Sequence, residues 1–400
     1  MIMLKTHPNY SRLIEIAHRS HEQDRSAADI SDEDIARARL YSYAFRCHVI
    51  GAFHATQQAL GQLEIRDTLA NAHQQRADQL LADLANRAMD PVGMDARALI
   101  STFHYYATHI EHIVEALNKT YDACGLDAMR QIRDGFVARM EEITTCSGIH
   151  LTKDTYAPEQ ASFIVPNLGI TIVPLVYGDF HSWNLAYLDA APYDVPFHLH
   201  QEGVEIHLGY GPVHGYTVLG ECYAEVDEGY AMPIPPKTRH GYVNNSTMVH
   251  HVPFIFGSLK LGGWGVFLDV EPQPISLSQL EQVSARGTKM NGTILLEREI
   301  EEAAAKVQSV RYPIIPVSLT DRNGVGGLEL SVARINKYGL TLKLDRFCMV
   351  SVVRGQGTVH MAGIEQPIDG RDHFGVPAGI SCFLRQEGDE PLVMLDAVIK

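Results

Sequence analysis

The spacing of apolar residues changes near residue 150 and divides the chain into a helical part and a strand-rich part. Before that point Gly and Pro are sparse, and apolar side chains in residues 31–64 recur every three to five positions, as on one face of a helix. Ser31 is suited to cap this helix. A second helical stretch, 94–125, stops at Gly125, a residue type common just past a helix end. We expect four to six helices in residues 1–150.

After residue 160, short apolar runs alternate with turns rich in Gly, Pro and Asn, a pattern typical of strands. A helical pattern returns over 296–310, and strands follow from Tyr312 to the end. We therefore predict an α+β multidomain protein, in which an N-terminal α-helical bundle precedes two β-rich domains of similar size. The predicted strands are 161–166, 169–177, 182–188, 215–226, 250–259 and 264–272. The predicted domains are 1–150, 156–275 and 283–400.

Imidazole and carboxylate side chains gather in the segment PFHLHQEGVEIHLGYGPVHG. Residues two apart on a strand share a face, so His198 and His200 present both rings to one side. QEGV, with Gly203, is suited to turn the chain into an antiparallel strand, on which Glu205 and His207 also share a face. If the two faces meet, two neutral imidazoles and a carboxylate form a facial ligand set with open metal positions. We expect a further ligand, His240, from a neighbouring strand.

Two motifs resemble those of the cupin family. The pattern His198-x-His200-x4-Glu205 resembles the first cupin motif, and Gly229-x5-Pro235-x4-His240-x3-Asn244 resembles the second. The resemblance covers about residues 160–275 and implies a jelly-roll barrel. It also implies one divalent metal held by His198, His200, Glu205 and His240 at the barrel mouth, with Fe(II) favoured and Zn, Mn or Ni as alternatives.

The chain departs from the cupin pattern at several positions. Lys237 stands where the second motif usually has a glycine, and Pro192 occupies one position where the first motif has one. Gly211 comes one residue early. Glu202 is a rival carboxylate ligand in the expected turn. The positions of the expected ligands themselves are intact.

The second β segment, 347–384, resembles the C-terminal cupin half of two-barrel cupins, including phosphomannose-isomerase-like proteins. It has no His-x-His pair, and Cys348 and Cys382 fall near the positions of the motif glutamate and histidine. His360 and His373 do not restore the spacing. Two lone thiols are a poor site for a hard divalent metal. We expect a metal-free cupin-like barrel that serves packing or closes the first site.

Residues around the expected ligands are candidates for catalysis and substrate binding. His207 would lie beside Glu205 as a catalytic proton shuttle or ligand-orienting partner, or as an ordinary core histidine. Lys237, Arg239 and Tyr242 flank His240. They are candidate substrate-binding residues, and the two cations would suit a carboxylate or phosphate. The alternative for the two cations is a solvated loop.

Composition narrows the partners. The net charge is −15, which argues against nucleic acid or an anionic membrane as the main partner. No run approaches a membrane span and the N-terminus lacks a secretion signal, so we expect a cytoplasmic protein. The six scattered cysteines are then expected to be reduced thiols.

The helical part carries a dense patch of His104, Tyr105, His109, Glu111 and His112. A di-iron bundle would need paired Glu-x-x-His motifs on two helices, which the sequence does not supply. We therefore expect the patch to form an interface. The apolar stripes predict that the helical domain packs on the first barrel, caps its mouth or forms a homodimer.

Three kinds of function fit these expectations, all with a small-molecule substrate or ligand. We favour a non-haem Fe(II) oxygenase acting on a small oxygenated and anionic metabolite. The first alternative is a metal-dependent isomerase, epimerase or lyase of sugar or hydroxy-acid chemistry. The second is a cupin that binds a small molecule without transforming it.

Overall fold

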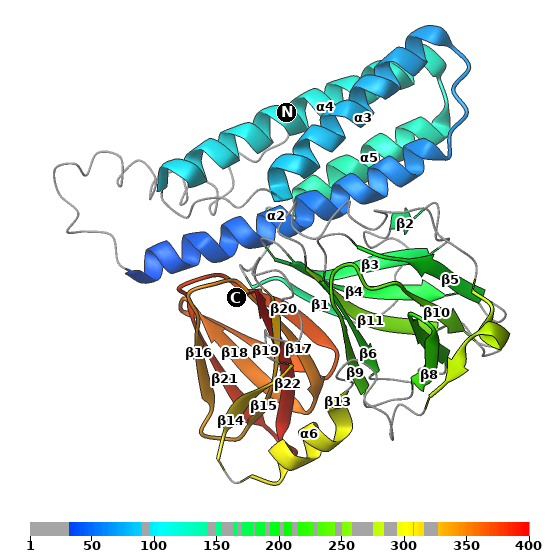
Figure 1. Cartoon of the computed structure of the whole chain (residues 1–400). Helices are drawn as coiled ribbons and strands as arrows, with labels where there is room; N and C mark the ends of the chain where they lie inside the picture. The colour runs from blue at the N-terminus through cyan, green and yellow to red at the C-terminus, as the bar shows by residue number, and fades with distance from the viewer. Residues whose placement is uncertain are drawn as a thin grey trace. The chain divides into compact units, whose positions relative to one another are not determined.

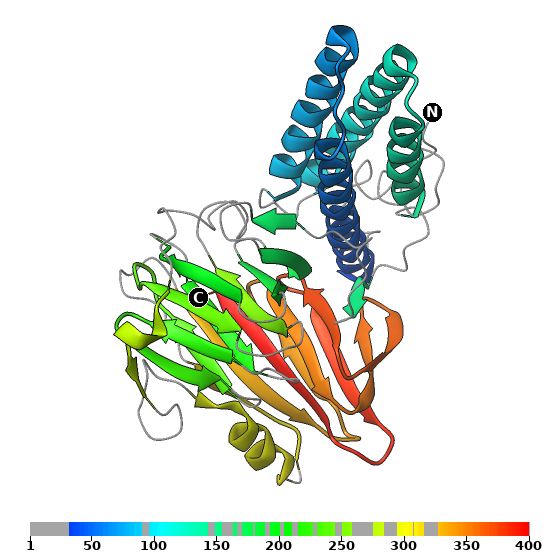
Figure 2. The same cartoon turned by 90° about the vertical axis from the view of Figure 1, so that its right-hand side faces the viewer.

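A helical part precedes strands arranged in four sheets, as a computed structural model shows (Figures 1 and 2). This confirms the predicted α+β class. The chain divides into two compact units, of which the first comprises Met1–His150, Ala157–Phe163 and Met361–Ile364, and the second comprises the remaining residues. The structure describes residues 32–89, 96–142, 149–153, 163–165, 170–178, 181–188, 193–200, 204–209, 215–226, 230–244, 250–257, 275–283, 294–306, 308–315 and 327–399.

Four helices form the described part of the first unit and lie side by side (Figures 1 and 2). The Asp67 carboxylate caps α3 by accepting a hydrogen bond from the Ala70 N–H at 2.8 Å. Gly125, with φ of +65°, follows α4 as expected, and its N–H bonds to the Tyr121 carbonyl. Among the described helices, none has an apolar stretch long enough to cross a bilayer. The helices are α2 (Asp32–Gly61), α3 (Thr68–Met89), α4 (Ala96–Cys124) and α5 (Asp127–Glu142).

Two sheets build the first β-rich part of the second unit. The seven-stranded sheet has the order β13-β9-β6-β11-β4-β3-β2, and the five-stranded sheet has the order β12-β8-β7-β10-β5. The strands are β2 (Phe163–Val165), β3 (Ile170–Tyr177), β4 (His181–Leu188), β5 (Tyr193–His198), β6 (Val204–Gly209), β7 (Gly215–Leu219), β8 (Cys222–Val226), β9 (Tyr230–Ile234), β10 (His240–Asn244), β11 (His250–Gly257), β12 (Glu281–Gln282) and β13 (Ile294–Leu295).

The five-stranded sheet is covered on both faces. One face contributes Leu219 and Ala224 to a buried cluster with Met232 and Ile234 of the seven-stranded sheet. This cluster is part of the barrel interior, because it joins side chains of both sheets. The other face carries a second cluster, packed by the segment around the 3-10 helix η5 (Leu277–Gln279). Its members are Phe197, Val218 and Val243, with Tyr216, Tyr223, Ile275, Leu277 and Leu280 packed against them.

Two further sheets build the second β-rich part. The six-stranded sheet has the order β1-β20-β17-β22-β15-β14, and the four-stranded sheet has the order β16-β21-β18-β19. The strands are β1 (Leu151–Lys153), β14 (Val310–Ile315), β15 (Leu328–Ile335), β16 (Leu340–Lys343), β17 (Cys348–Arg354), β18 (Gln356–Met361), β19 (Ile364–Asp369), β20 (Asp372–Val376), β21 (Ser381–Glu387) and β22 (Leu392–Ile399).

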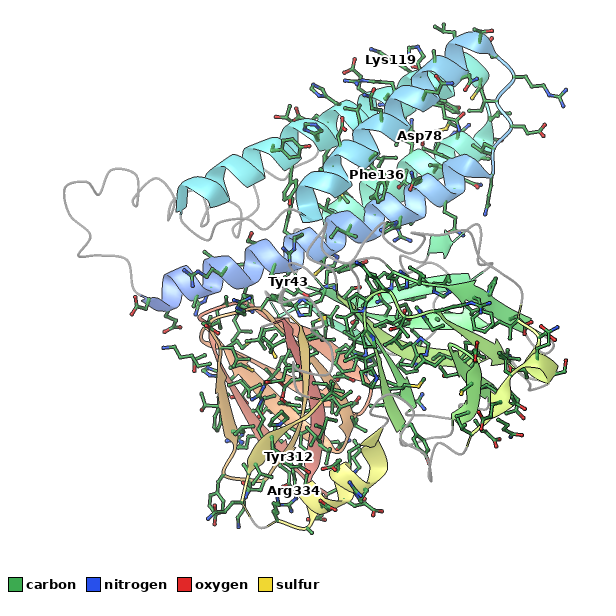
Figure 3. All side chains as sticks on the ribbon, viewed as in Figure 1. Tyr43, Asp78, Lys119, Phe136, Tyr312 and Arg334 are labelled. Carbon is green, nitrogen blue, oxygen red and sulfur yellow. The ribbon has the colours of Figure 1, made fainter. Side chains whose placement is uncertain are left out.

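The structure differs from the predicted elements at the ends of the two β-rich parts. Strand β1 precedes the first of them in sequence but pairs antiparallel with β20 in the second. The helix α6 (Leu296–Ala304) ends earlier than the predicted residue 310, because Val310 begins β14 and pairs with β15. The Tyr312 hydroxyl ties the two elements together by donating to the Glu299 carbonyl at 2.8 Å, and its side chain lies beside α6 in Figure 3. The predicted strand 264–272 lies outside the described residues.

Candidate metal centre

The strands of the first barrel place His198 and His240 side by side. β10 pairs antiparallel with β5, and these two histidines are directly opposite one another in the register. Their ring centroids are 4.3 Å apart. The Lys237 N–H donates to the His200 carbonyl at 2.6 Å, which holds the turn before β10 against the end of β5.

Glu205 reaches this pair from the other sheet, which differs from the predicted hairpin. β6 pairs with β9 and β11 of the seven-stranded sheet, whereas β5 belongs to the five-stranded sheet. The chain therefore crosses from one sheet to the other between His200 and Val204, and the ligand faces meet across the barrel interior. The side chains come together because each sheet turns its ligand-bearing face toward the barrel interior.

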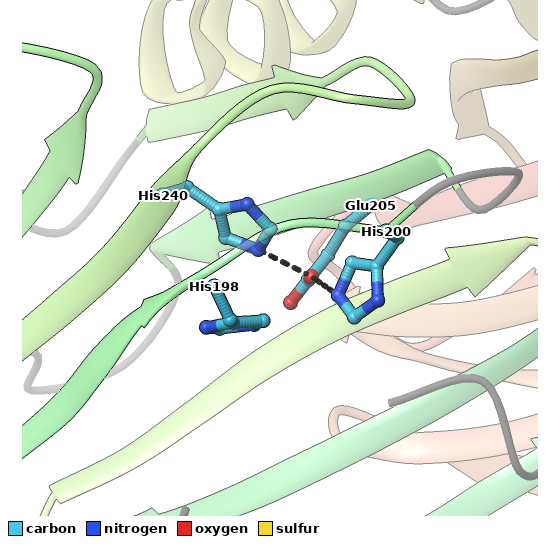
Figure 4. Close-up of side chains that lie close together, drawn as sticks. All are labelled: His198, His200, Glu205 and His240. Atoms are coloured by element: carbon cyan, nitrogen blue, oxygen red, sulfur yellow. Dashed lines mark hydrogen bonds and ion pairs between the residues drawn. The ribbon is translucent and has the colours of Figure 1, made fainter. Parts of the chain in front are cut away.

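The four residues form one compact cluster (Figure 4). One ligand atom from each of His198, His200, Glu205 and His240 lies within 4.8 Å of the others, and all four residues are buried. Glu205 Oε2 is 3.2 Å from His200 Nε2 and 3.1 Å from His240 Nε2. Within the part of the chain that the structure describes, no other such group of His, Cys, Asp and Glu occurs.

Backbone carbonyls orient two of the rings. His198 Nδ1 is 2.8 Å from the Pro196 carbonyl, and His240 Nδ1 is 2.8 Å from the Thr238 carbonyl. A carbonyl only accepts hydrogen bonds, so each Nδ1 carries the hydrogen and each Nε2 keeps its lone pair. This is the usual way in which a protein fixes a metal-binding tautomer. His200 is oriented differently, since its ring packs edge-on against Phe256 at 4.8 Å.

Electrostatics favour the protonation states that metal ligands need at His198, His240 and Glu205. Burial, together with the neighbouring His240 and His200, lowers the pKa of His198 to about 3. Burial also lowers the pKa of His240. Burial would raise the pKa of Glu205, but His207, His200 and His240 outweigh it and bring that pKa well below its usual value. Neutral imidazoles and an ionised carboxylate are the forms that bind metal.

The cluster fits a divalent transition metal. Imidazole nitrogens and one carboxylate oxygen suit Fe, Zn, Mn or Ni, and geometry alone does not choose among them. Four protein ligands leave coordination positions for water or substrate when the metal prefers five or six ligands. Glu202, the rival carboxylate, lies outside the described residues.

His207 is hydrogen bonded to Glu205, one of the four candidate ligands. Its Nε2 is 2.9 Å from Glu205 Oε1, the carboxylate oxygen that does not contact His200 or His240. Both oxygens of the Glu205 carboxylate therefore have close neighbours, and Oε2 points between the rings of His200 and His240. Such a partner restricts how a carboxylate can bind a metal.

The three candidate substrate-binding residues occupy different environments. Tyr242 is 3 % exposed and its ring centroid is 6.4 Å from that of His207. Lys237 and Arg239 are exposed. The Arg239 guanidinium stacks 3.8 Å above the Phe197 ring, on the strand face opposite to His198 and His240. Arg239 therefore does not join the cluster, and neither cation places a positive charge beside it.

The backbone conformation of Lys237 explains why the second motif usually has a glycine at this position. Lys237 has a φ of 61°, in the left-handed region that glycine adopts without steric cost. We expect Lys237→Gly to stabilise the protein by about 0.5–1 kcal/mol, because relief of about 1–2 kcal/mol of strain exceeds the extra chain entropy that glycine loses. Thermal unfolding measures this gain. The matched variant Lys237→Ala keeps the Cβ, and an equal gain there would contradict the argument.

The second barrel holds a different set of buried groups. Cys348 and Cys382 are both 0 % exposed, and burial raises the pKa of each thiol. A protonated thiol is not a metal ligand. Arg311 donates to both carboxylate oxygens of the fully buried Asp396 at 2.7–3.2 Å. That this barrel carries no metal stays a prediction.

The aromatic patch of the helical unit shows packing between side chains of α4. The Tyr105 and His109 rings stack with centroids 3.9 Å apart, and the Tyr105 hydroxyl donates to the Asp83 carbonyl of α3. An interface role for this patch, and packing of the bundle on the barrel or in a homodimer, stay predictions. Cys124, Cys222, Cys348 and Cys382 form no disulfide, and Cys146 lies outside the described residues.

Two residues near the cluster had no signal in the sequence. Phe256 contacts the His200 ring from β11, and Thr217 is the register partner of Tyr242 on β7. Neither belongs to a motif. Their positions become visible only when β11 and β7 are placed beside the ligand-bearing strands.

Comparison with known proteins finds similar barrels among solved structures. No family model matches the sequence, and no curated protein matches it. A cupin 2 conserved barrel domain protein from Leptotrichia buccalis is 12% identical, with a TM-score of 0.40, over 58% of this chain and 89% of that one. A salicylate 1,2-dioxygenase from Pseudaminobacter salicylatoxidans is 15% identical, with a TM-score of 0.40, over 55% of this chain and 71% of that one.

Proposed function

We propose that the chain is a metal-dependent enzyme of the cupin superfamily, because two pairs of sheets form its two β-rich parts and the first pair encloses a cluster of three histidines and one glutamate. The observation that carries this proposal is the convergence of four ligand atoms within 4.8 Å of one another. Four buried imidazole and carboxylate groups would be costly to gather without a ligand. We propose a small oxygenated metabolite as the substrate.

We propose oxygenase chemistry with Fe(II) as the favoured metal. Bound Fe(II) would supply one-electron chemistry with O2 and a position at which substrate can coordinate. The chain's own residues hold the carboxylate and rings in place. They also exclude bulk water, since each of the four is at most 8 % exposed. Exclusion of water limits side reactions of a reactive centre.

A metal-dependent isomerase, epimerase or lyase is the second candidate, and the placement of His207 favours it. His207 Nε2 hydrogen bonds Glu205, and its ring lies on the inner face of β6. An imidazole there could accept or return a proton at Nδ1 while the metal polarises a carbonyl or hydroxyl of the substrate. In either case we propose His207 as the residue that positions Glu205 and moves a proton.

Metal identity and oxygen dependence distinguish the candidates. Elemental analysis of protein purified without added metal is expected to give about one metal per chain, with iron predominant for the oxygenase. The Fe(II) form is then incubated with a panel of small hydroxy-carbonyl and diol metabolites under ¹⁸O2 and under argon. Incorporation of ¹⁸O into product supports the oxygenase. Equal turnover under argon would contradict it and support the isomerase or lyase, and binding without turnover would indicate a non-catalytic cupin.

A further inference from the structure

A second layer of polar side chains lies beside the metal centre inside the first barrel. His207 follows Glu205 by two residues on β6, and Tyr242 follows His240 by two residues on β10, so each shares a face with a candidate ligand. Thr217 of β7 is the register partner of Tyr242. The His207 ring centroid is 6.1 Å from that of His240 and 6.4 Å from that of Tyr242. We call His207, Thr217 and Tyr242 the polar layer.

Each member of the polar layer keeps a buried polar atom without a partner among the described residues. These atoms are His207 Nδ1, Thr217 Oγ1 and the Tyr242 hydroxyl. Thr217 is 0 % exposed, Tyr242 3 % and His207 8 %. Buried polar groups are nearly always hydrogen bonded in folded proteins, because leaving one unpaired is costly. Three such atoms in one layer, next to a metal centre, indicate a place where a bound molecule completes the hydrogen bonds.

The Tyr242 side chain is accommodated by a glycine. A Cβ at Gly215 would collide with the Tyr242 hydroxyl, so the absence of a side chain there allows the hydroxyl to lie along β7. Burial raises the pKa of Tyr242, and the phenol therefore remains a hydrogen-bond donor. The phenol of Tyr242 therefore lies along β7, on the same inner face as Thr217.

The charge of the barrel limits what can bind in this layer. Between residues 163 and 257 the sequence contains only two Lys or Arg side chains, Lys237 and Arg239. Both are exposed, and Arg239 stacks on Phe197. An anionic group bound in the polar layer, rather than to the metal, would lose its hydration without gaining a Lys or Arg partner. A hydroxyl or carbonyl group needs only the donors and acceptors that the layer provides.

We propose that the polar layer binds an uncharged hydroxyl or carbonyl group of the substrate while another part of the substrate reaches the metal. This inference rests on the proposed function of the first barrel and narrows its substrate class to molecules with an uncharged, hydrogen-bonding end. The sequence had instead led us to expect that Lys237 and Arg239 bind a carboxylate or phosphate of the substrate. The proposed uncharged group takes the place of that anionic group.

Two ketones that differ by one hydroxyl test the inference. Hydroxyacetone and dihydroxyacetone share a metal-chelating hydroxy-ketone, and only dihydroxyacetone has a second hydroxyl to reach the polar layer. Binding to the Co(II)-loaded full chain is followed through the visible spectrum of the metal. We expect dihydroxyacetone to bind about fivefold more tightly, the value of one ordinary hydrogen bond. Tyr242→Phe and Thr217→Val should reduce this preference, and Tyr242→Phe should not lower the thermal unfolding temperature of the ligand-free chain.

The control is Tyr216→Phe, which removes a phenol from the other face of β7, where Tyr216 packs against Tyr223. It should leave the fivefold preference intact. Equal binding of the two ketones, absence of binding by either, or an unchanged preference in both layer variants would overturn the inference while leaving the metal centre standing. A chain that takes up no Co(II) would refute the proposed function itself.

Discussion

His240→Ala and His200→Ala are each expected to abolish most metal binding while the protein remains folded. Each variant removes one imidazole from a cluster of four ligands, and with it a ring nitrogen that lies 3.1–3.2 Å from Glu205 Oε2. Loss of a residue that merely orients a ligand already weakens metal binding about 10–100-fold, so loss of a ligand should exceed about a hundredfold. Elemental analysis after dialysis measures the metal, and circular dichroism verifies folding.

Two further variants are expected to affect metal binding less than the loss of a ligand. His207→Gln removes the residue that holds Glu205 Oε1, and it should weaken metal binding by about 10–100-fold without abolishing it. His360 is exposed on β18 of the second barrel, and His360→Gln should leave the metal content unchanged. Full metal retention in both His200→Ala and His240→Ala would refute the assignment of the centre.

Acidification from pH 7 to pH 5 is expected to destabilise the protein strongly, through histidines buried outside the metal cluster. Burial lowers the pKa of His54 and His373 to about 3, whereas the unfolded value is about 6.5. The unfolded chain therefore binds more protons than the folded chain between these values, and stability falls as the pH drops from about 6.5 toward 3. At pH 5 each histidine should cost about 2 kcal/mol of unfolding free energy relative to neutral pH.

His373→Leu isolates one of these contributions. The His373 ring is 5.9 Å from Trp183, so tryptophan fluorescence during urea unfolding in the presence of a chelator reports on its surroundings. The loss of stability between pH 7 and pH 5 should be about 2 kcal/mol smaller in this variant than in the native chain. The exposed His360→Gln serves again as the control and should show the native pH dependence. The same pH dependence in His373→Leu would show that His373 titrates normally in the folded protein.

The local pattern of the sequence determined which side of each strand a residue occupies. A strand alternates its faces every two residues wherever it is placed, so Glu205 and His207 had to share a face, as did His240 and Tyr242. The two motifs therefore identified the residues that the structure brings together, although metal binding by them stays a prediction. Gly125 ended its helix for an equally local reason, because it adopts a positive φ without steric cost.

Only the tertiary structure decided which strands became neighbours and how deeply each group was buried. The sequence predicted a hairpin between His200 and Glu205, but β5 and β6 belong to different sheets. Strand β1 pairs with β20, which lies more than two hundred residues later in the chain. Arg239 stacks on Phe197, on the face of the five-stranded sheet that points away from the candidate ligands. Thr217 belongs to the polar layer because β7 pairs with β10. Strand pairing and desolvation depend on contacts between segments far apart in the chain, whereas periodicity within one segment fixes only the direction of its side chains.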